Sequence, residues 1–398
     1  MEEPRTRVLF VDDDTLILEL IRLTVGSMKG EWDTGFATSA EEALGLIEHE
    51  PFDVVVSDMR LPGMNGTQLL NVVMRQYPGT VRIILSGHGD QEEVLRCVGA
   101  THQFLLKPFK LPELQAALNR IKGLKARLAS AEIQRLVAKR EHLPSIPKVY
   151  FEILDALQNP ECSSEELGNI VSTDPALTSK LLQLVNSAFM GFAREVASAE
   201  EAVMLLGTGT IRSLALGLHA FSAFKSSPRT EATLQRVWEH SARVARFAER
   251  ITRLEGGDEK MAEESFTAGL LHDIGKLLLV DNQSAAYLEI LARAGAQGEG
   301  LIHAERIALN ATHAEIGAYL LDLWGLPLPL VEAVAYHHEP GGAGHFEPGA
   351  LTFVHAADVL EHEAATPPRA GGPLDLDYLA QLGLESRIDE WRQQLAEL

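Results

Sequence analysis

Short apolar runs alternate with longer amphipathic stretches over about the first 120 residues of the chain. The apolar runs are rich in Val, Ile and Leu, which is typical of buried strands. They cover residues 8–11, 53–58, 81–86 and 103–107, with a weaker run at 32–38. The stretches with helical apolar spacing cover residues 14–27, 39–48, 66–76 and 90–98. Because alternating strands and helices form parallel sheets covered on both faces, the pattern predicts an α/β, doubly wound, five-stranded parallel sheet.

The apolar pattern becomes continuously helical after Leu111. Apolar residues at heptad spacing cover only about two heptads, too few to predict a coiled coil. We therefore expect a linker helix over residues 123–142, and a homodimer through this helix is an open alternative. Pro144 and Pro147 cannot continue the helix, so a new domain is expected to begin near them. Nearly everything beyond is helical in pattern, which predicts an all-α domain.

These breaks predict four segments of the chain. We expect the α/β domain over residues 1–122, the linker helix over 123–142 and the all-α domain over 143–365. The remaining residues, 366–398, are expected to form a C-terminal extension that packs on the all-α domain.

Composition and charge narrow the function classes. Of the 398 residues, 46% are hydrophobic and 23% are charged, as in ordinary globular proteins. The net charge is −21, and residues 143–398 contribute −18 of it. A surface this acidic repels a phosphate backbone, so we expect no DNA-binding output. Without a membrane-spanning run, a signal core or a cysteine framework (Cys97 and Cys162 are far apart), the expected location is the cytoplasm, with no membrane contact.

Polar residues follow the predicted strands of the α/β domain directly. Asp12 and Asp13 follow the first strand and Asp58 ends the third. Ligands bind beyond the carboxyl ends of parallel strands, so the three carboxylates are expected to meet there. Mg²⁺, which prefers oxygen ligands, would relieve their mutual repulsion. Ser86 and Lys107 end two further strands and would add a hydroxyl and a cation, completing a site that can accept a phosphoryl group.

Four motifs carry a family resemblance in this half of the chain. They are Val11-Asp12-Asp13-Asp14, Ser57-Asp58-Met59-Arg60-Leu61-Pro62-Gly63-Met64-Asn65-Gly66, Leu85-Ser86-Gly87 and Leu106-Lys107-Pro108-Phe109. They resemble the receiver domain of two-component response regulators, a flavodoxin-like fold. The resemblance implies that Asp58 accepts a phosphoryl group from a sensor histidine kinase. It assigns Mg²⁺ to Asp12, Asp13 and the backbone carbonyl of Arg60. It assigns the phosphorylation switch to Ser86, Phe104 and Lys107.

Ten of the fourteen histidines lie between His219 and His362. His240 has Val237 and Val244 on its helix face, so it is expected to point inward. Similar inward positions are expected for His272, Asp273, His313, His337, His338 and Asp358. A buried carboxylate needs a partner, and ligands from five helices favour a metal site in a bundle core. The alternative, that each histidine is an ordinary core residue with its own hydrogen bond, remains open.

The order His, His-Asp, His, His-His, Asp resembles the HD phosphohydrolase superfamily, especially its HD-GYP branch. There, such ligands bridge two metal ions that activate water against a phosphodiester. The resemblance implies a dinuclear iron or manganese centre, with Lys276 as a phosphate contact. Two departures stand against it. Residues 339–345 replace the expected Gly-Tyr-Pro loop, and Arg236 stands where a glutamate is often found.

A second resemblance covers about residues 143–365. Its motifs include Leu143-Pro144-Ser145-Ile146-Pro147, Ser172-Thr173-Asp174-Pro175-Ala176-Leu177, Leu182-Gln183-Leu184-Val185-Asn186-Ser187-Ala188 and Leu323-Trp324-Gly325-Leu326-Pro327. They resemble the HDOD domain, an all-helical and mostly regulatory family in which many members lose the HD-type ligands. We therefore expect a response regulator whose HDOD domain is a regulatory, protein-interaction module that binds an unknown protein or nucleotide. The alternative is a phospho-regulated metal phosphohydrolase acting on a cyclic dinucleotide or another nucleotide.

Overall fold

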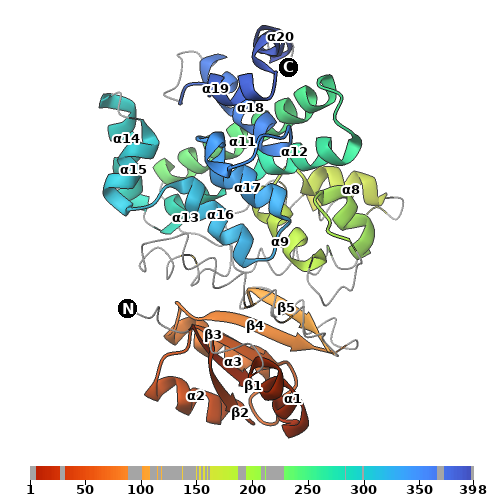
Figure 1. The fold of residues 1–398 in the computed structure, drawn as a ribbon, viewed down its shortest axis with the longest axis vertical. Helices are drawn as coiled ribbons and strands as arrows, with labels where there is room; N and C mark the ends of the chain where they lie inside the picture. Colours follow the sequence, from red (N-terminus) through yellow and green to blue (C-terminus); the bar gives the residue numbers. More distant parts are fainter. Residues whose placement is uncertain are drawn as a thin grey trace. The chain divides into compact units, whose positions relative to one another are not determined.

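The computed structural model describes most of the chain and divides it into two compact units, one mainly of residues 1–141 and one mainly of residues 142–398. The described residues are 6–26, 32–87, 101–107, 162–186, 194–207, 228–282, 284–297, 300–364 and 372–395, with single residues between 108 and 161 and at 211. Figure 1 draws the first unit in red to orange and the second in yellow to blue. The predicted helix at 90–98 lies outside the described residues. So does the linker helix, apart from Val137.

The first unit contains a five-stranded, wholly parallel sheet with the strand order β2-β1-β3-β4-β5. Its strands are β1 (Thr6–Val11), β2 (Trp32–Ala37), β3 (Val54–Asp58), β4 (Val81–Ser86) and β5 (Gln103–Leu106). Its described helices are α1 (Thr15–Gly26), α2 (Ala40–His49) and α3 (Gly66–Gln76). The central strand β3 is buried throughout. The predicted doubly wound α/β sheet, including the weak second strand, is confirmed.

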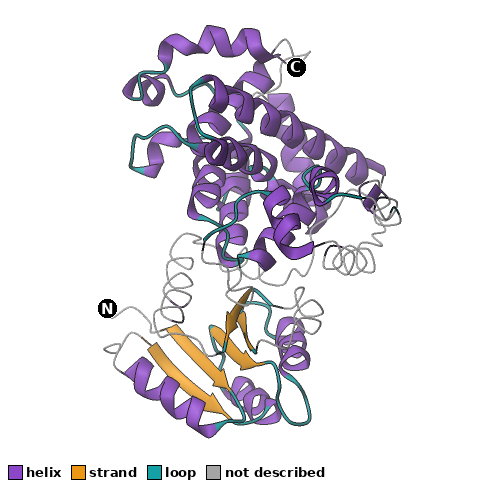
Figure 2. Cartoon of the chain, turned by 90° about the vertical axis from the view of Figure 1, so that its right-hand side faces the viewer, coloured by secondary structure: helices purple, strands orange, loops and turns teal. Residues whose placement is uncertain are grey.

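All regular secondary structure among the described residues of the second unit is helical, and loops connect the helices (Figure 2). Its helices are α8 (Ser164–Val171), α9 (Pro175–Val185), α11 (Pro228–Leu254), α12 (Glu259–Leu271), α13 (Ile274–Asn282), α14 (Ser284–Gln297), α15 (Leu301–Leu309), α16 (His313–Leu323), α17 (Leu328–Tyr336), α18 (Ala350–Ala364), α19 (Leu376–Gln381) and α20 (Ile388–Leu395). Two 3₁₀ turns are η2 (Pro340–Ala343) and η3 (Glu385–Arg387). Helices α11, α12 and α18 pack on one another, and α17 packs on α12 and α18. The expected all-α fold is confirmed.

Two glycines let helices of this unit approach closely. A Cβ added at Gly269 of α12 would lie 2.7 Å from the Cα of Ala245 in α11. One added at Gly275 of α13 would lie 2.0 Å from the carbonyl oxygen of His313, at the start of α16. Contacts this short exclude any side chain. Glycine is therefore what lets α13 and α16 meet, and this brings Asp273 next to His313.

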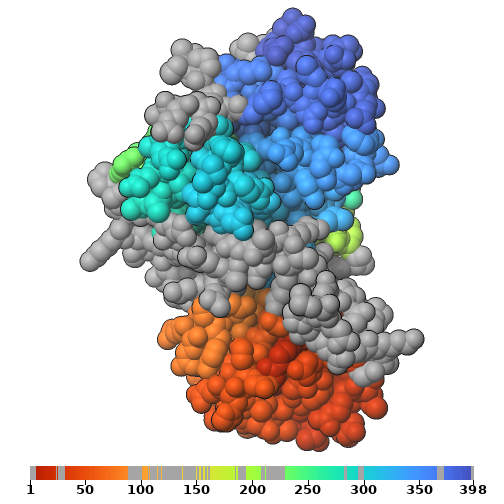
Figure 3. Space-filling model, turned by 60° about the vertical axis from the view of Figure 1, so that its left-hand side comes forward, coloured from red at the N-terminus to blue at the C-terminus, as the bar shows by residue number. Residues whose placement is uncertain are grey.

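The C-terminal elements η3 and α20 contact the C-terminal end of the long helix α11. Trp391 of α20 is fully buried, and its Nε1 donates a hydrogen bond of 2.8 Å to Glu255 just after α11. Arg387 donates to the same carboxylate. Figure 3 shows one face of the molecule, with residues of α14 and α15 in cyan and the C-terminal residues in blue at the surface. Among the described helices, none combines the length and the apolar character that crossing a membrane requires.

Candidate functional site

The carboxyl ends of β1 and β3 bring three carboxylates together in the first unit. Oxygen atoms of Asp12, Asp13 and Asp58 lie within 4.8 Å of one another. Asp12 and Asp58 are buried and Asp13 is exposed. The parallel register explains the meeting, because Val11 pairs with Ser57 and the next residue on each side is an aspartate, Asp12 and Asp58. The cluster has the oxygen donors that Mg²⁺ prefers.

Lys107 supplies the positive charge at this edge of the sheet. Its Nζ lies 2.5 Å from Oδ2 of Asp12 and 3.0 Å from Oδ1 of Asp58. Burial raises the pKa of Asp58, while the hydrogen bond and charge of Lys107 oppose the rise. The lysine therefore helps to hold a buried carboxylate in its ionised form, which is the form able to act as a nucleophile.

The remaining predicted residues of this site lie nearby in the fold. Ser86 ends β4, and its buried hydroxyl has no hydrogen-bond partner within the described part of the chain; Phe104 of β5 is 2% exposed. Arg60 is exposed in the loop after β3. Sequence reasoning missed the role of Gly66, the first residue of α3. A Cβ there would lie 1.9 Å from the carbonyl oxygen of Asp58, so only glycine allows the chain to pass so close to the central aspartate.

All seven predicted HD-type residues converge in the core of the second unit. His240 lies on α11, His272 and Asp273 between α12 and α13, His313 at the start of α16, His337 and His338 after α17, and Asp358 on α18. All are buried except His338, whose side chain is 17% exposed. Three groups of these residues offer ligand atoms within 4.8 Å of one another. They are His313 with His337 and His338, His240 with His272 and Asp273, and His272 with His337 and Asp358.

The same hydrogen-bonding arrangement orients two of the imidazoles. Nδ1 of His272 donates to the carbonyl of Gly269 at 2.7 Å, and Nδ1 of His337 donates to the carbonyl of Val334 at 2.9 Å. This leaves Nε2 of each ring as the atom with a free lone pair. Both Nε2 atoms are buried and have no hydrogen-bond partner among the described residues. Burying a polar nitrogen without a hydrogen-bond partner destabilises the folded state, and coordination to a metal ion would satisfy its lone pair.

Carboxylates orient two further imidazoles, and sequence reasoning missed both. Glu305, fully buried on α15, accepts hydrogen bonds from Nδ1 of His313 at 2.8 Å and from its backbone N–H at 2.9 Å. Glu361 on α18 accepts from Nδ1 of His240 at 2.7 Å. A histidine ligand typically donates its second N–H to such a carboxylate. The signal available in the sequence was the spacing of Glu361, three residues after Asp358 and hence on the same helix face.

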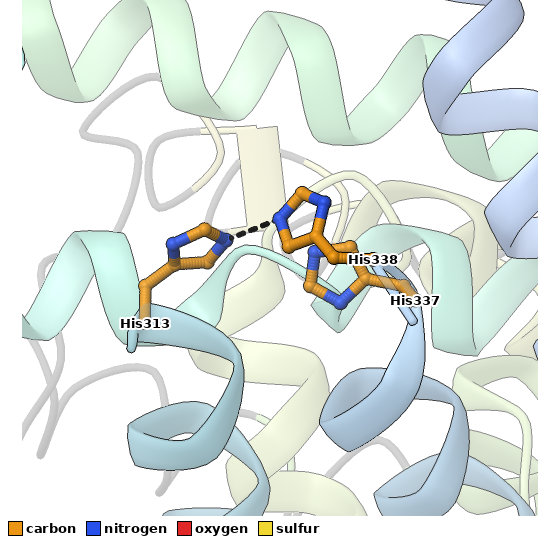
Figure 4. A group of neighbouring side chains, drawn as sticks. All are labelled: His313, His337 and His338. Carbon is orange, nitrogen blue, oxygen red and sulfur yellow. Dashed lines mark hydrogen bonds between the residues drawn. The ribbon is translucent and has the colours of Figure 1, made fainter. Parts of the chain in front are cut away.

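Two histidines that the sequence left unexplained lie beside this centre. Nδ1 of His362 is 3.0 Å from Oδ1 of Asp358. His355 is fully buried, and its Nδ1 donates to the carbonyl oxygen of His337 at 2.7 Å. Nζ of Lys276 lies 2.7 Å from Oδ2 of Asp273, and the assignment of this lysine as a phosphate contact stays a prediction. Figure 4 shows His313, His337 and His338 together, with a hydrogen bond of 3.0 Å between Nε2 of His338 and Nε2 of His313.

The electrostatics of the centre favour ionised carboxylates and mostly neutral rings. Burial alone would lower the pKa of His240, but hydrogen bonds to Asp358 and Glu361 outweigh it and raise the pKa to about 9. Burial lowers the pKa of His337 and of His338 well below the usual value. Burial would raise the pKa of Asp358, yet the hydrogen bond from His240 leads the effects that hold it well below its usual value. Neutral imidazoles beside carboxylates are a donor set suited to iron, manganese or zinc.

Comparison with known families decides the class. The response regulator receiver domain family matches residues 8–119, and the HDOD domain family matches residues 143–340. This chain is a response regulator with an HDOD output domain. The two matches fall on the α/β sheet and on the helical unit that holds the histidine centre.

Several relatives resemble this response regulator in sequence. An uncharacterized protein of Treponema pallidum is 27% identical over 265 residues, covering 64% of this chain and 49% of the relative. The response regulator PilR of Pseudomonas aeruginosa is 33% identical over 132 residues, covering 32% of this chain and 29% of PilR. The regulator thus corresponds to about half the length of the first relative and to less of the second. The solved MmoQ response regulator of Methylococcus capsulatus is 29% identical, covering 64% of this chain and 97% of that one, with a TM-score of 0.49.

Proposed function

We propose that Asp58 accepts a phosphoryl group from a sensor histidine kinase and that this event controls the HDOD domain. The observation that carries the proposal is the placement of Lys107 between Asp12 and Asp58, at 2.5 and 3.0 Å, beside a third carboxylate. Asp12, Asp13 and the backbone carbonyl of Arg60 would hold Mg²⁺, which shields the charge on the transferring phosphoryl group. A carboxylate oxygen of Asp58 would form the new O–P bond as the P–N bond of the phosphohistidine breaks.

Residues already at the sheet edge would hold the product. The ammonium group of Lys107, which forms an ion pair with Asp58 before phosphorylation, can pair with a phosphoryl oxygen afterwards. The Ser86 hydroxyl, which has no partner among the residues that the structure describes, can donate a hydrogen bond to another phosphoryl oxygen. Movement of Ser86 toward the phosphoryl group would leave space beside β5, and Phe104 would move to fill it. The added charge of the phosphoryl group would thereby change the molecular surface beside β4 and β5.

Exposed leucines on α1 support a kinase as the donor. Leu16, Leu20 and Leu23 are 77%, 58% and 69% exposed and are spaced to share one helix face. Helix α1 begins at Thr15, three residues after Asp12, so this apolar face starts at the helix end that is close in sequence to the carboxylate cluster. Clustered exposed leucines mark an interaction surface. Leu20→Glu should slow phosphorylation by the kinase while labelling by acetyl phosphate stays normal; equal loss of both would contradict a docking role.

Labelling with radioactive acetyl phosphate tests the acceptor. Asp58→Asn should abolish incorporation, because the amide is not a nucleophile. Asp33→Asn is the control, since Asp33 is an exposed aspartate of the same unit that pairs with Arg7. Undiminished labelling of Asp58→Asn would overturn the assignment.

We further propose that the HDOD domain acts as a non-DNA-binding regulatory module that binds metal. The ligands would be the seven residues of the centre, and the orphaned Nε2 atoms of His272 and His337 support this. Iron or manganese as a dinuclear pair fits the donor set. Metal analysis of the purified protein tests it. Substoichiometric metal that does not change in His272→Ala would contradict the proposal.

A metal-dependent phosphohydrolase is the second candidate for this domain. The observation that favours it is Lys276, which pairs with Asp273 and also lines a cleft beside the centre. A bound metal would supply an activated water for attack on a phosphoester. A hydrolysis screen on cyclic dinucleotides and mononucleotides with metal-loaded protein distinguishes the candidates. Metal without turnover favours the regulatory module.

A further inference from the structure

A cleft of about 1010 Å³ opens beside the histidine centre within the helical unit. Lys276, His338 and His362 lie at its inner end, where they connect it to the centre. Apolar side chains that include Leu301 and Leu374 form part of its walls. A cleft of this size, apolar with a few polar groups, suits a small organic ligand.

The groups at the inner end of the cleft can bind one anion. Lys276 contributes an ammonium group that is 11% exposed and already paired with Asp273. The N-terminus of α15 lines the same cleft, and its N-cap, Gly300, has no side chain to cap the helix. The first backbone N–H groups of a helix bind phosphate well when no side chain occupies them. Together the lysine and the helix end can hold a phosphate group beside the metal ligands.

The outer part of the cleft has the opposite charge. Glu339, Asp375 and Asp377 line it, and Lys276 is the single lysine or arginine among the described lining residues. The carboxylate of Asp375 caps α19 by accepting from the backbone N–H of Tyr378, which leaves Glu339 and Asp377 to face a ligand. Carboxylates repel a second phosphate, but they accept hydrogen bonds from amino groups. The charge pattern therefore selects a ligand with one phosphate at one end and amino or imino N–H groups at the other.

We propose that the cleft binds an amino-bearing phosphate monoester, such as a purine mononucleotide, with its phosphate on Lys276 and the N-terminus of α15. The proposal rests on the proposed metal centre for the position of the phosphate, and it excludes a cyclic dinucleotide as the preferred ligand. The N–H donors of the base meet Glu339 and Asp377.

The outer wall of the cleft is connected to a metal-ligand candidate. The backbone N–H of Asp375 donates to Nε2 of His355 at 3.0 Å, and Nδ1 of His355 donates to the carbonyl oxygen of His337 at 2.7 Å. Tyr378 adds a hydrogen bond of 2.8 Å to Thr352. The segment therefore cannot shift without changing the hydrogen bonds behind His337, so ligand binding and metal binding are expected to affect each other reciprocally.

Isothermal titration of the full chain tests the proposal with three probes, GMP, UMP and cyclic di-GMP, each with manganese-loaded and with chelator-treated protein. GMP should bind about tenfold or more tightly than either other probe, because only GMP has one phosphate and the full set of purine N–H donors. Lys276→Gln should weaken GMP binding by about tenfold or more. Lys260→Gln, an exposed lysine on α12, is the matched control and should leave it unchanged.

A second, milder variant keeps the proposal testable if Lys276→Gln fails to fold. Asp377 is exposed in the first turn of α19, and Asp377→Asn should reduce the preference for GMP over UMP without changing metal content. Tighter binding of cyclic di-GMP, no binding of GMP to the metal-loaded chain, or an unchanged preference in Asp377→Asn would overturn the proposal. Metal content and Asp58 labelling on the same preparations report separately on the proposed function. A chain without metal that still binds GMP through Lys276 would refute the metal centre alone.

Discussion

Replacing Glu305 by glutamine will weaken metal binding at the histidine centre. The carboxylate of Glu305 accepts two hydrogen bonds from His313 and one from the hydroxyl of Tyr287. Glutamine keeps this shape, because its carbonyl can face His313 while its amide N–H donates to the Tyr287 oxygen, which can rotate to accept it. The substitution therefore removes the charge behind His313 and little else.

The expected size of the effect follows from that single change. Loss of a carboxylate that hydrogen-bonds to a metal-binding histidine typically lowers metal affinity 10–100-fold. For Glu305→Gln we expect a loss of about tenfold, near 1.4 kcal/mol, because the hydrogen bonds are kept. Glu305→Ala would also leave the buried N–H groups of His313 unpaired. That variant should lose about 100-fold in affinity and about 1–3 kcal/mol of unfolding free energy.

Competition between the protein and a fluorescent chelator for Mn²⁺ measures the affinity, and thermal unfolding in chelator measures the stability of the metal-free chain. Glu289→Gln is the matched control, because Glu289 is exposed on α14 and carries the same charge. An affinity of folded Glu305→Gln equal to that of wild type would refute the argument that this carboxylate positions and activates His313.

Three further outcomes are expected. Gly66→Ala should lower the unfolding free energy by about 1–3 kcal/mol and reduce Asp58 labelling, because the new Cβ would lie 1.9 Å from the Asp58 carbonyl oxygen. Gly45→Ala is the control: it has open space around it in helix α2 and should stabilise the chain. Titrations of Mn²⁺ should show affinity rising with pH toward about 9, because a cation at Nε2 of His240 must displace the proton that its raised pKa retains. Trp391→Ala should lower the unfolding free energy by about 3–5 kcal/mol in denaturant titrations if the C-terminal extension is part of the HDOD fold.

The sequence was sufficient for the sheet and for the residues at its edge. Strands of a parallel sheet are buried on both faces and therefore read as continuous apolar runs, and the predicted run at 53–58 differs from β3 by one residue. Asp12 and Asp58 could be paired because Asp12 directly follows one such run and Asp58 ends another. What the sequence could not show was the distance from Gly66 to Asp58, because that contact depends on how the loop after β3 folds back.

The sequence predicted the candidate metal ligands of the histidine centre but not the residues that hydrogen-bond to them. His240 and Asp358 stand on apolar faces of helices, where a polar residue is conspicuous. Glu305 escaped notice because a glutamate in an amphipathic helix is usually solvated, and its burial arises from the packing of α14 and α15 against His313. His355 was equally hidden, because its partners are a backbone carbonyl and a backbone N–H that no side-chain pattern reveals.

The side chains of the centre come from parts of the chain that are distant in sequence; His240 and Asp358, 3.0 Å apart, are separated by 118 residues. An unfolded chain does not present such groups together, so a cation held here would bind the folded state alone. Each tenfold rise in free metal above the dissociation constant would then add about 1.4 kcal/mol to the unfolding free energy. The folded population of the HDOD domain would thus depend on metal supply. A cell short of this metal would hold less working regulator, however strongly its kinase signals.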